Sequence, residues 1–325
     1  MENENSQNRP EFKGQLGALF ELYLTNFLLT LCTLGVYSFW GKTNIRKYIW
    51  GNCQFGSDRF SYHGTGDELI RGFVKAILIF FAANVLFIIL KTVLLRALGH
   101  TKLLDVVFGI FQYAMLFGFF ALAMIGTWRY RLSRTSWRGI RFAFTGKTID
   151  YVSLVVSNFF LQVFTLGFYL PFGTVRAAEF RISHTYFGSQ RFELRANGGD
   201  LFLSFVIAVL LTPFTLGLVW FWYVAELKRY LWSRTRVGKL RFSMNVTGGD
   251  LLFLGLTNLL IVVFTMGLGF PVAIKRKIDF FSQRIVVKGS LDDLIVYQTP
   301  QTDSALGEAL GEFLQVDFDI GLGIG

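Results

Sequence analysis

Long apolar segments alternate with short polar joints along most of the chain. The apolar segments lie near residues 16–40, 72–95, 103–128, 149–172, 201–223 and 251–274. Each approaches or exceeds the roughly 20 residues that a helix needs to cross a bilayer. The joints contain phrases such as RFELRANGGDL from Arg191 and RFSMNVTGGDL from Arg241, which begin with a β-rich stretch and end near glycines. The pattern predicts apolar helices connected by short strands.

The pattern repeats, with a period of about fifty residues in its clearest copies. A Thr-Leu-Gly or Thr-Met-Gly element recurs, with its glycine at Gly35, Gly167, Gly217 and Gly267. An Arg-Phe pair follows most copies, and an acidic residue placed to cap the next helix comes after it, at Asp67, Asp200 and Asp250. A diverged copy begins at Gly139, and a shortened last copy begins at Ser282, with Ile285 where the others have Phe. These copies indicate five structural units.

The distribution of basic residues indicates how each unit crosses the membrane. Basic clusters lie at 42–47, 129–141, 228–241 and 275–288. One crossing per unit would place about half of them outside, against the positive-inside rule, whereas two crossings keep them all in the cytoplasm. The Thr-x-Gly element supplies the break that a turn needs. Each unit is therefore predicted to be a helical hairpin; the alternative is six plain transmembrane helices kinked at their glycines.

The arms of these hairpins differ in length. The arm from Gly199 to Pro213 is about 22 Å long at 1.5 Å per residue, too short for a full hydrocarbon core. We therefore expect a mainly α, polytopic membrane protein of about five repeated helical-hairpin units, some of them re-entrant, each followed by a short cytoplasmic β-strand element. The predicted divisions are a cytoplasmic segment 1–15, units at about 16–66, 67–148, 149–198, 199–248 and 249–297, and an acidic tail 298–325.

Composition supports a membrane protein, since 53% of the residues are hydrophobic and only 17% are charged. The formal net charge of +10 comes from Lys and Arg that mostly flank apolar segments, so it points to a membrane surface and not to nucleic acid. The polar start, MENENSQNRPEF, lacks the features of a cleaved signal. We expect a multi-pass protein of the bacterial inner membrane with both termini in the cytoplasm.

Asparagines inside the apolar arms are the leading ligand-binding candidates. Three units place one nine residues before the turn glycine, at Asn26, Asn158 and Asn258, and the fourth unit has Ala208 there. An amide in hydrocarbon must find partners, so these side chains either tie helices together or line a polar path for a solute or lipid. Asn84, in the second apolar segment, is a further candidate.

Basic and aromatic residues at the joints predict an interfacial belt that binds anionic lipid or anchors the protein. Its candidate residues are Arg59, Arg141, Arg191, Arg241, Lys228 and Arg229.

The histidines are scattered, and the sequence contains no zinc, phosphate-loop, dinucleotide or nucleophile-elbow motif. We therefore expect no enzyme activity, no cofactor and no metal.

Three phrases near the N-terminus resemble the YjgN family of bacterial inner-membrane proteins. They are F-K-G-x-L-G-x-L-F from Phe12, L-T-L-x-T-L-G-V-Y-S-F-W-G-K from Leu29 and F-G-x-D-R-F-x-Y-H-G-T-G-x-E-L from Phe55. The similarity extends over about residues 11–295 and implies a polytopic inner-membrane protein, without catalytic residues to carry over. Family genes often lie near a membrane metallopeptidase gene, which implies a peptidase as one partner.

Two functional hypotheses follow from the sequence. The first is a protein that binds or translocates a small solute or lipid through a polar path between the repeats. The second is a scaffold that holds a partner such as a membrane peptidase through its basic cytoplasmic face and acidic tail. Membrane lipids are the expected partners in the first case.

Overall fold

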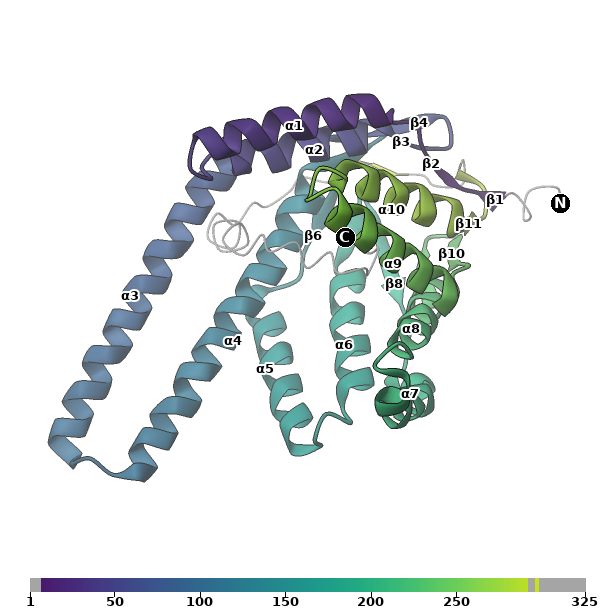
Figure 1. The fold of residues 1–325 in the computed structure, drawn as a ribbon. Helices are drawn as coiled ribbons and strands as arrows, with labels where there is room; N and C mark the ends of the chain where they lie inside the picture. Colours follow the sequence, from purple (N-terminus) through teal and green to yellow (C-terminus); the bar gives the residue numbers. More distant parts are fainter. Residues whose placement is uncertain (1–6, 292–295, 298–325) are drawn as a thin grey trace.

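The computed structural model describes residues 7–291 and 296–297 and is mainly helical. The acidic tail 298–325 lies outside the described residues. The helices are α1 (Leu16–Cys32), α2 (Ser38–Asn52), α3 (Gly66–Leu98), α4 (Lys102–Ser133), α5 (Thr148–Phe164), α6 (Leu170–Ser183), the 3₁₀ turn η1 (Gly198–Leu201), α7 (Phe202–Thr215), α8 (Trp220–Arg234), α9 (Gly248–Phe264) and α10 (Phe270–Arg284). They follow one another as five pairs, and Figure 1 shows the pairs projecting from one end of the molecule.

A pair of short strands follows each of the first four helix pairs. The strands are β1 (Gln7–Asn8), β2 (Pro10–Phe12), β3 (Cys53–Phe55), β4 (Asp58–Tyr62), β5 (Thr135–Trp137), β6 (Ile140–Phe144), β7 (Thr185–Phe187), β8 (Gln190–Leu194), β9 (Thr235–Val237), β10 (Leu240–Met244) and β11 (Ile285–Lys288). Thus each of the first four joints forms a β-hairpin, where one strand element was expected.

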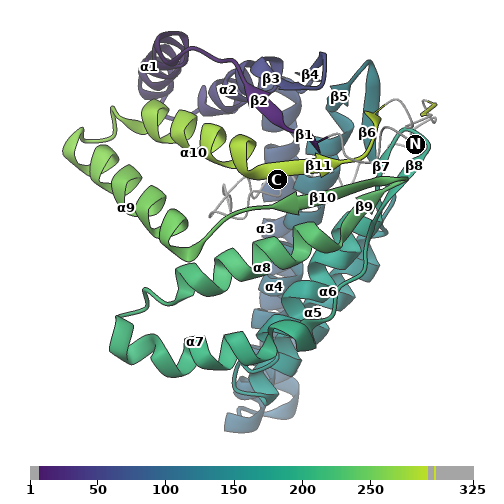
Figure 2. The same ribbon diagram turned by 90° about the vertical axis from the view of Figure 1, so that its right-hand side faces the viewer.

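All eleven strands belong to one antiparallel sheet in the order β1-β11-β10-β9-β8-β7-β6-β5-β4-β3-β2. Its two end strands, β1 and β2, are consecutive in the chain and are separated only by Arg9. The ends of the sheet therefore meet, and the sheet curls into a nearly closed barrel (Figure 2). The sequence predicted a layer of strands but not this closure.

The Arg-Phe phrase forms the wall of the barrel because side chains alternate between the two faces of a strand. Phe60, Phe142, Phe192 and Phe242 pack on the barrel's core cluster, whereas the arginine before each of them is exposed. The rings lie close together: centroids are 4.9 Å apart for Phe142 and Phe187 and 6.1 Å apart for Phe192 and Phe242. The repeated phrase thus supplies the same inward ring from four strands.

The shortened last copy takes a different place from the one its sequence indicated. Ile285 was matched with the phenylalanine of the Arg-Phe pairs, but it begins β11 directly after α10, as Thr235 begins β9 directly after α8. In the earlier units a second strand follows the first, but after β11 its place in the sheet is taken by the N-terminal segment. There β1 pairs with β11, and β2 pairs with β3. The alignment of Ile285 with Phe was wrong because the missing strand lies at the other end of the chain.

The Thr-Leu-Gly element forms the tip of each short helix pair. The Thr33 hydroxyl donates to the Leu29 carbonyl at 2.8 Å and accepts the Tyr37 backbone N–H at 2.9 Å, so it joins the two helices. Leu34 and Gly35 then take φ values of +50° and +95°, a left-handed conformation that glycine adopts without steric cost. Matching hydroxyl contacts occur at Thr165, Thr215 and Thr265.

The helix pairs form a ring around the end of the barrel. The second helix of each pair contacts the first helix of the next, and α10 contacts α1, so the ring also closes. The pair α3–α4 is longer than the others and extends beyond them (Figure 1). Among the described residues, three helical segments are long and apolar enough to span a membrane, namely α3, α4 and Gly198–Thr215, while α1, α5 and α9 are apolar but shorter.

Replacing Phe142 with Ala tests the inward role of the repeated phenylalanines. Loss of this ring leaves Phe187 and Phe192 facing a cavity, and we expect the free energy of unfolding to fall by about 3 kcal/mol. Phe164→Ala is the matched control, because Phe164 lies at a hairpin tip and is 81% exposed. Denaturant unfolding in detergent measures both variants. Equal losses at the two positions would contradict the barrel core.

Candidate functional site: the hairpin asparagines and the basic joints

Each of the three repeat asparagines bonds across its own hairpin. The Nδ2 of Asn26 donates to the carbonyl of Gly41 at 3.4 Å, and that of Asn158 donates to the carbonyl of Gly173 at 3.2 Å. Asn258 donates to the carbonyl of Ala273 at 3.4 Å. In all three cases the acceptor is fifteen residues later in the chain, so the contact joins the first helix of a pair to the second.

Small residues on the second helix make room for these carboxamides. A Cβ on Gly41 would lie 3.2 Å from the Cβ of Asn26, and one on Gly173 would lie 3.3 Å from the Cγ of Asn158. The fourth unit inverts the sizes: Ala208 takes the asparagine position, and Tyr223, fifteen residues later, fills the space within the same buried cluster. Each hairpin thus matches a larger side chain on one helix with a smaller one on the other.

The carboxamides retain unused hydrogen-bonding capacity. Asn26 and Asn158 are only 5% and 6% exposed. The Oδ1 of Asn26 accepts from Asn44 Nδ2 at 3.4 Å, but the Oδ1 atoms of Asn158 and Asn258 are buried and have no hydrogen-bond donor among the described residues. A buried acceptor without a donor costs free energy, so a water or a ligand hydroxyl at either atom would be stabilising.

Asn84 lies apart from the other three asparagines, in the long pair α3–α4. Its Oδ1 accepts from Gln112 Nε2 at 3.1 Å, and its Nδ2 donates to the Phe80 carbonyl at 2.8 Å. This contact ties α3 to α4 within their apolar length. The four asparagines therefore occupy four different helix pairs, and their hydrogen bonds do not bring them together.

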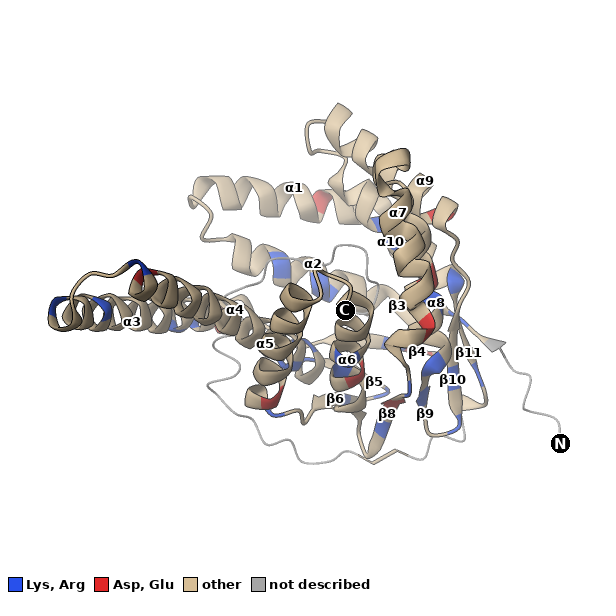
Figure 3. Ribbon diagram, turned by 90° about the horizontal axis from the view of Figure 1, so that it is seen from below, with Lys and Arg blue, Asp and Glu red and all other residues tan. Residues whose placement is uncertain are grey.

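The basic candidates fall into two places. Arg59, Arg141, Arg191 and Arg241 are exposed on the outside of the barrel, where Lys and Arg gather on the strands in Figure 3. Arg229 is exposed on α8, and its Nη1 donates to the Val246 carbonyl at 3.0 Å. Lys228, the neighbouring residue, is 0% exposed, with its Nζ 4.6 Å from the centre of the Phe281 ring.

Acids on the barrel surface are held by neighbouring arginines. Asp58 accepts from Arg138 Nε at 2.7 Å, and hydrogen bonds from Arg138 and then Ser57 keep the pKa of Asp58 below its ordinary value. A hydrogen bond from Arg236, together with its charge, likewise lowers the pKa of Glu193. Both carboxylates are therefore charged partners of arginine over the neutral pH range.

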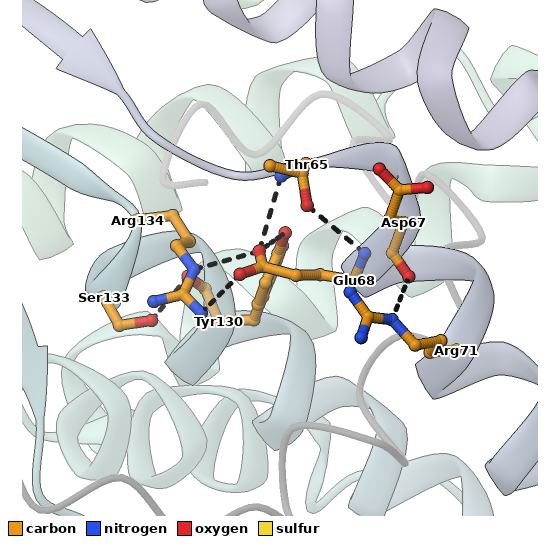
Figure 4. A network of polar contacts seen from close by, with 7 residues as sticks. All are labelled: Thr65, Asp67, Glu68, Arg71, Tyr130, Ser133 and Arg134. Carbon is orange, nitrogen blue, oxygen red and sulfur yellow. Dashed lines mark hydrogen bonds and ion pairs between the residues drawn. The ribbon is translucent and has the colours of Figure 1, made fainter.

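A second polar contact recurs where the helices meet the barrel, and only part of it was predicted from the sequence. Glu68 and Thr65 form a capping box at the start of α3, and Glu68 also accepts from Arg134 at 2.9 and 3.1 Å and from Tyr130 at 2.9 Å (Figure 4). The sequence indicated the acidic cap but placed it at Asp67. It missed the arginine at the end of the second helix.

The same acid–arginine contact joins the start of the first helix to the end of the second in two other units. Asp250 caps α9 with Thr247 and lies 3.2 Å from Arg284, and Asp200 accepts from Tyr230 at 2.6 Å and lies 3.8 Å from Arg234. The repeat spacing of these arginines, at the ends of α8 and α10, was the signal that could have revealed the contact. Its place at the base of these three hairpins indicates a structural role.

Metal-ligating residues do not cluster in the part of the chain that the structure describes. Within residues 7–291 and 296–297, no group of three or more His, Cys, Asp or Glu side chains is placed to hold a metal ion. The candidate site is therefore built from amides, arginines and apolar surface.

The fold and the site define the class of protein, which is an integral membrane protein with apolar helices attached to a small barrel. The chain matches the family described as "Bacterial protein of unknown function (DUF898)" over residues 7–217 and 203–313, and it belongs to that family.

Curated relatives agree with this assignment. Inner membrane protein YjgN of Salmonella typhimurium (strain LT2) is 29% identical over 141 residues, which are 43% of this chain and 32% of that protein. The YjgN proteins of Escherichia coli O157:H7 and K12 are 27% and 26% identical over 133 residues, 41% of this chain and 30% of theirs. These matches confirm the resemblance to the YjgN family, although the aligned stretch spans only about a third of the relatives' length. No solved structure matches the chain significantly.

Replacing Asn158 with Leu separates the two roles proposed for the asparagines. Loss of the Gly173 contact should lower the free energy of unfolding by about 0.6 kcal/mol, the usual value for a hydrogen bond between membrane helices. If Asn158 also lines a path, the purified variant should retain less phosphatidylglycerol in native mass spectrometry, and we expect a partial loss. Ser157→Ala is the control, because that hydroxyl bonds only the Leu154 carbonyl. Full lipid retention by a well-folded Asn158→Leu protein would leave Asn158 with the structural role alone.

Proposed function

We propose that this protein is a non-enzymatic inner-membrane protein that binds lipid, with four short hairpins entering one leaflet and one long hairpin crossing the bilayer. In this arrangement the barrel and both termini lie in the cytoplasm. The hairpin units then correspond to the five repeats of the sequence, and the short ones are re-entrant. Lipid headgroups are held where the hairpins meet the barrel.

The observation that carries the proposal is the exposed apolar tip of each short hairpin. Leu34, Leu166, Leu216 and Met266 occupy the same repeat position and are 95%, 89%, 92% and 95% exposed. Each lies in the turn that joins the two helices of its pair, in a left-handed backbone conformation. Apolar residues exposed together in this way are typical of surfaces that contact a membrane or a partner.

Helix lengths support two depths of insertion. The helix α3 has 33 residues and is about 50 Å long, which exceeds the roughly 30 Å of the hydrocarbon core. The helices α1, α5 and α9 have 17 residues each and are about 26 Å long, and the segment Gly198–Thr215 has 18 residues and is about 27 Å long, so all four fall slightly short of the hydrocarbon core. At the far end of the long pair, Lys91 and Asp105 lie 3.9 Å apart, and charged side chains near the end of a membrane helix reach the membrane surface.

Two of the four second helices of the short pairs, α2 and α8, carry a cation that favours a lipid ligand, at a position where α6 and α10 have the acids Glu179 and Asp279. Lys47 on α2 and Arg229 on α8 occupy the same repeat position, twelve residues after the turn glycine, and both are exposed. Each cation near an anionic surface contributes about 1 kcal/mol to binding. Because these helices lead directly into the barrel, their cations lie near the headgroups when the tips enter the acyl chains.

A narrower form of this proposal and one alternative function remain. A polar path for a solute or lipid would pass the repeat asparagines, and the unpaired Oδ1 atoms of Asn158 and Asn258 favour it. A scaffold that holds a membrane peptidase or another protein is the alternative, and the exposed basic surface of the barrel favours that function.

Site-directed cysteine labelling in cells tests the arrangement. In a Cys32→Ser, Cys53→Ser background, Cys replaces one residue in each of three barrel turns (Ser57, Ser189 and Lys239), one at the far end of the long hairpin (His100) and one at a tip (Leu166). A membrane-impermeant maleimide should label His100→Cys in intact cells and the three barrel positions only after lysis. Leu166→Cys should resist the reagent in both conditions. Labelling of Leu166→Cys in intact cells, or barrel positions on different sides, would exclude re-entrant hairpins.

Lipid retention tests the binding function. The double variant Lys47→Ala, Arg229→Ala should lower the affinity for phosphatidylglycerol by about 2 kcal/mol, since each cation contributes about 1 kcal/mol. Native mass spectrometry of protein released from mixed nanodiscs measures the retained lipid. Lys102→Ala is the matched control, because Lys102 is exposed at the far end of the long hairpin. Equal retention by the double variant and the control would contradict headgroup binding by the second helices.

A further inference from the structure

The outside of the barrel carries a row of cations on three neighbouring strands. The register pairs Arg236 on β9 with Arg241 on β10, and it pairs Arg241 with Lys288 on β11. Side chains directly opposite in an antiparallel pair have Cβ atoms about 5 Å apart, and like charges placed there destabilise the sheet. We call Arg236, Arg241 and Lys288 the cation row.

Only one acid in the described part of the chain offsets the row. Glu193 accepts from Arg236 at 3.0 and 2.6 Å, and it also lies 3.6 Å from Arg195. Arg241 and Lys288 are exposed, and the ion pairs among the described residues do not include either of them. An anion covering the row would relieve this repulsion.

The chain carries an anionic segment that begins close to the row. The last described residues lie against the barrel: Val296 packs on its core cluster, and the Tyr297 backbone N–H donates to Ser189 Oγ at 3.3 Å. Ser189 lies in the turn between β7 and β8, and β10 is about three strand spacings, roughly 14 Å, from β7. The residues that follow Tyr297 contain no Lys or Arg but include Asp303, Glu308, Glu312, Asp317 and Asp319.

The length of the chain permits contact. Asp303 lies six positions after Tyr297, and an extended chain of that length spans up to roughly 20 Å. The tether keeps the local concentration of the acidic segment in the millimolar range, far above that of a separate partner. Opposite charge, reach and tethering therefore all favour an occupant from the same chain.

We propose that the acidic segment 303–319 docks on the cation row, with its carboxylates bound to Arg241 and Lys288 and, beside Glu193, to Arg236. The docked segment covers the basic surface of the barrel and keeps it from anionic lipid and from acidic proteins. Release of the segment exposes that surface. The inference does not depend on lipid binding by the hairpins, because it concerns only the barrel and the tail.

Zero-length carbodiimide coupling of the full-length protein in phosphatidylcholine nanodiscs tests this contact. The reagent joins an amine to a carboxylate that touches it, so mass spectrometry should find Lys288 linked to tail carboxylates. Lys147 is the matched control, because it is exposed at the start of α5 and lies outside the row. We expect about tenfold more tail links at Lys288 than at Lys147, consistent with a tethered local contact. Equal yields at the two lysines would overturn the proposal.

High salt and charge-changing variants test whether the links depend on the cation row. The Lys288 links should fall severalfold in 1 M NaCl, where the Debye length is about 3 Å, and in the variant Arg241→Glu. The tail variant Asp303→Asn, Glu308→Gln leaves the barrel unchanged and should remove the links at those two positions. Links that persist unchanged in high salt and in Arg241→Glu would show a contact that does not depend on the cation row.

Other occupants give distinct results in the same assay. In a mixture of unlabelled and isotope-labelled chains, links of mixed mass show that the tail docks on a second copy and overturn the intramolecular contact. Links that disappear when phosphatidylglycerol is added to the nanodiscs show that lipid takes the row in a native membrane, which also overturns it. Links within one chain that survive in both lipids support it.

Discussion

The structure depends on one pairing, which joins the N-terminal segment to both ends of the sheet. The strand β1 pairs with β11 and β2 pairs with β3, and Asn8 Nδ2 also donates to the Gly289 carbonyl, 281 residues away. Without this segment the sheet would have two open edges with unpaired backbone groups, which favour aggregation. Every helix pair is attached to strands of this sheet, so closing the barrel also brings α10 against α1 and completes the ring of helices.

Within that ring, polar contacts between the two helices of a pair recur with the repeat. A threonine hydroxyl joins the two helices at the tip, an asparagine reaches a carbonyl fifteen residues later in the middle, and an acid meets an arginine at the base. Such contacts matter because lipid offers no hydrogen bonds to replace those of water. The units also tolerate coordinated change, as the exchange of Ala208 and Tyr223 in the fourth unit shows.

Two chemically different surfaces result from this arrangement. The hairpins expose apolar side chains along their first helices and at their tips, while the barrel exposes arginines and lysines beside few acids. On the barrel, each Arg-Phe phrase sends its ring inward and its guanidinium outward, so the basic surface lies outside the aromatic core. Lipid binding by the hairpins and tail docking on the barrel are therefore independent proposals about separate parts of the molecule.

The sequence by itself determined the local features of this protein. The apolar runs predicted the helices, the Thr-Leu-Gly elements predicted breaks in them, and the β-rich phrases predicted strands, because each depends on residues within a few positions of one another. The positions of Asn26, Asn158 and Asn258 were also visible as a repeat, but their acceptors were not, since the phase of one helix against the next is set by packing. Only the tertiary structure decided that the strands form one barrel, that Glu68 meets Arg134, and that Lys228 is buried while Arg229 is exposed. Those outcomes depend on the closure of the barrel, in which β1 and β11, at opposite ends of the described chain, pair with each other. No short window of sequence contains both of these strands.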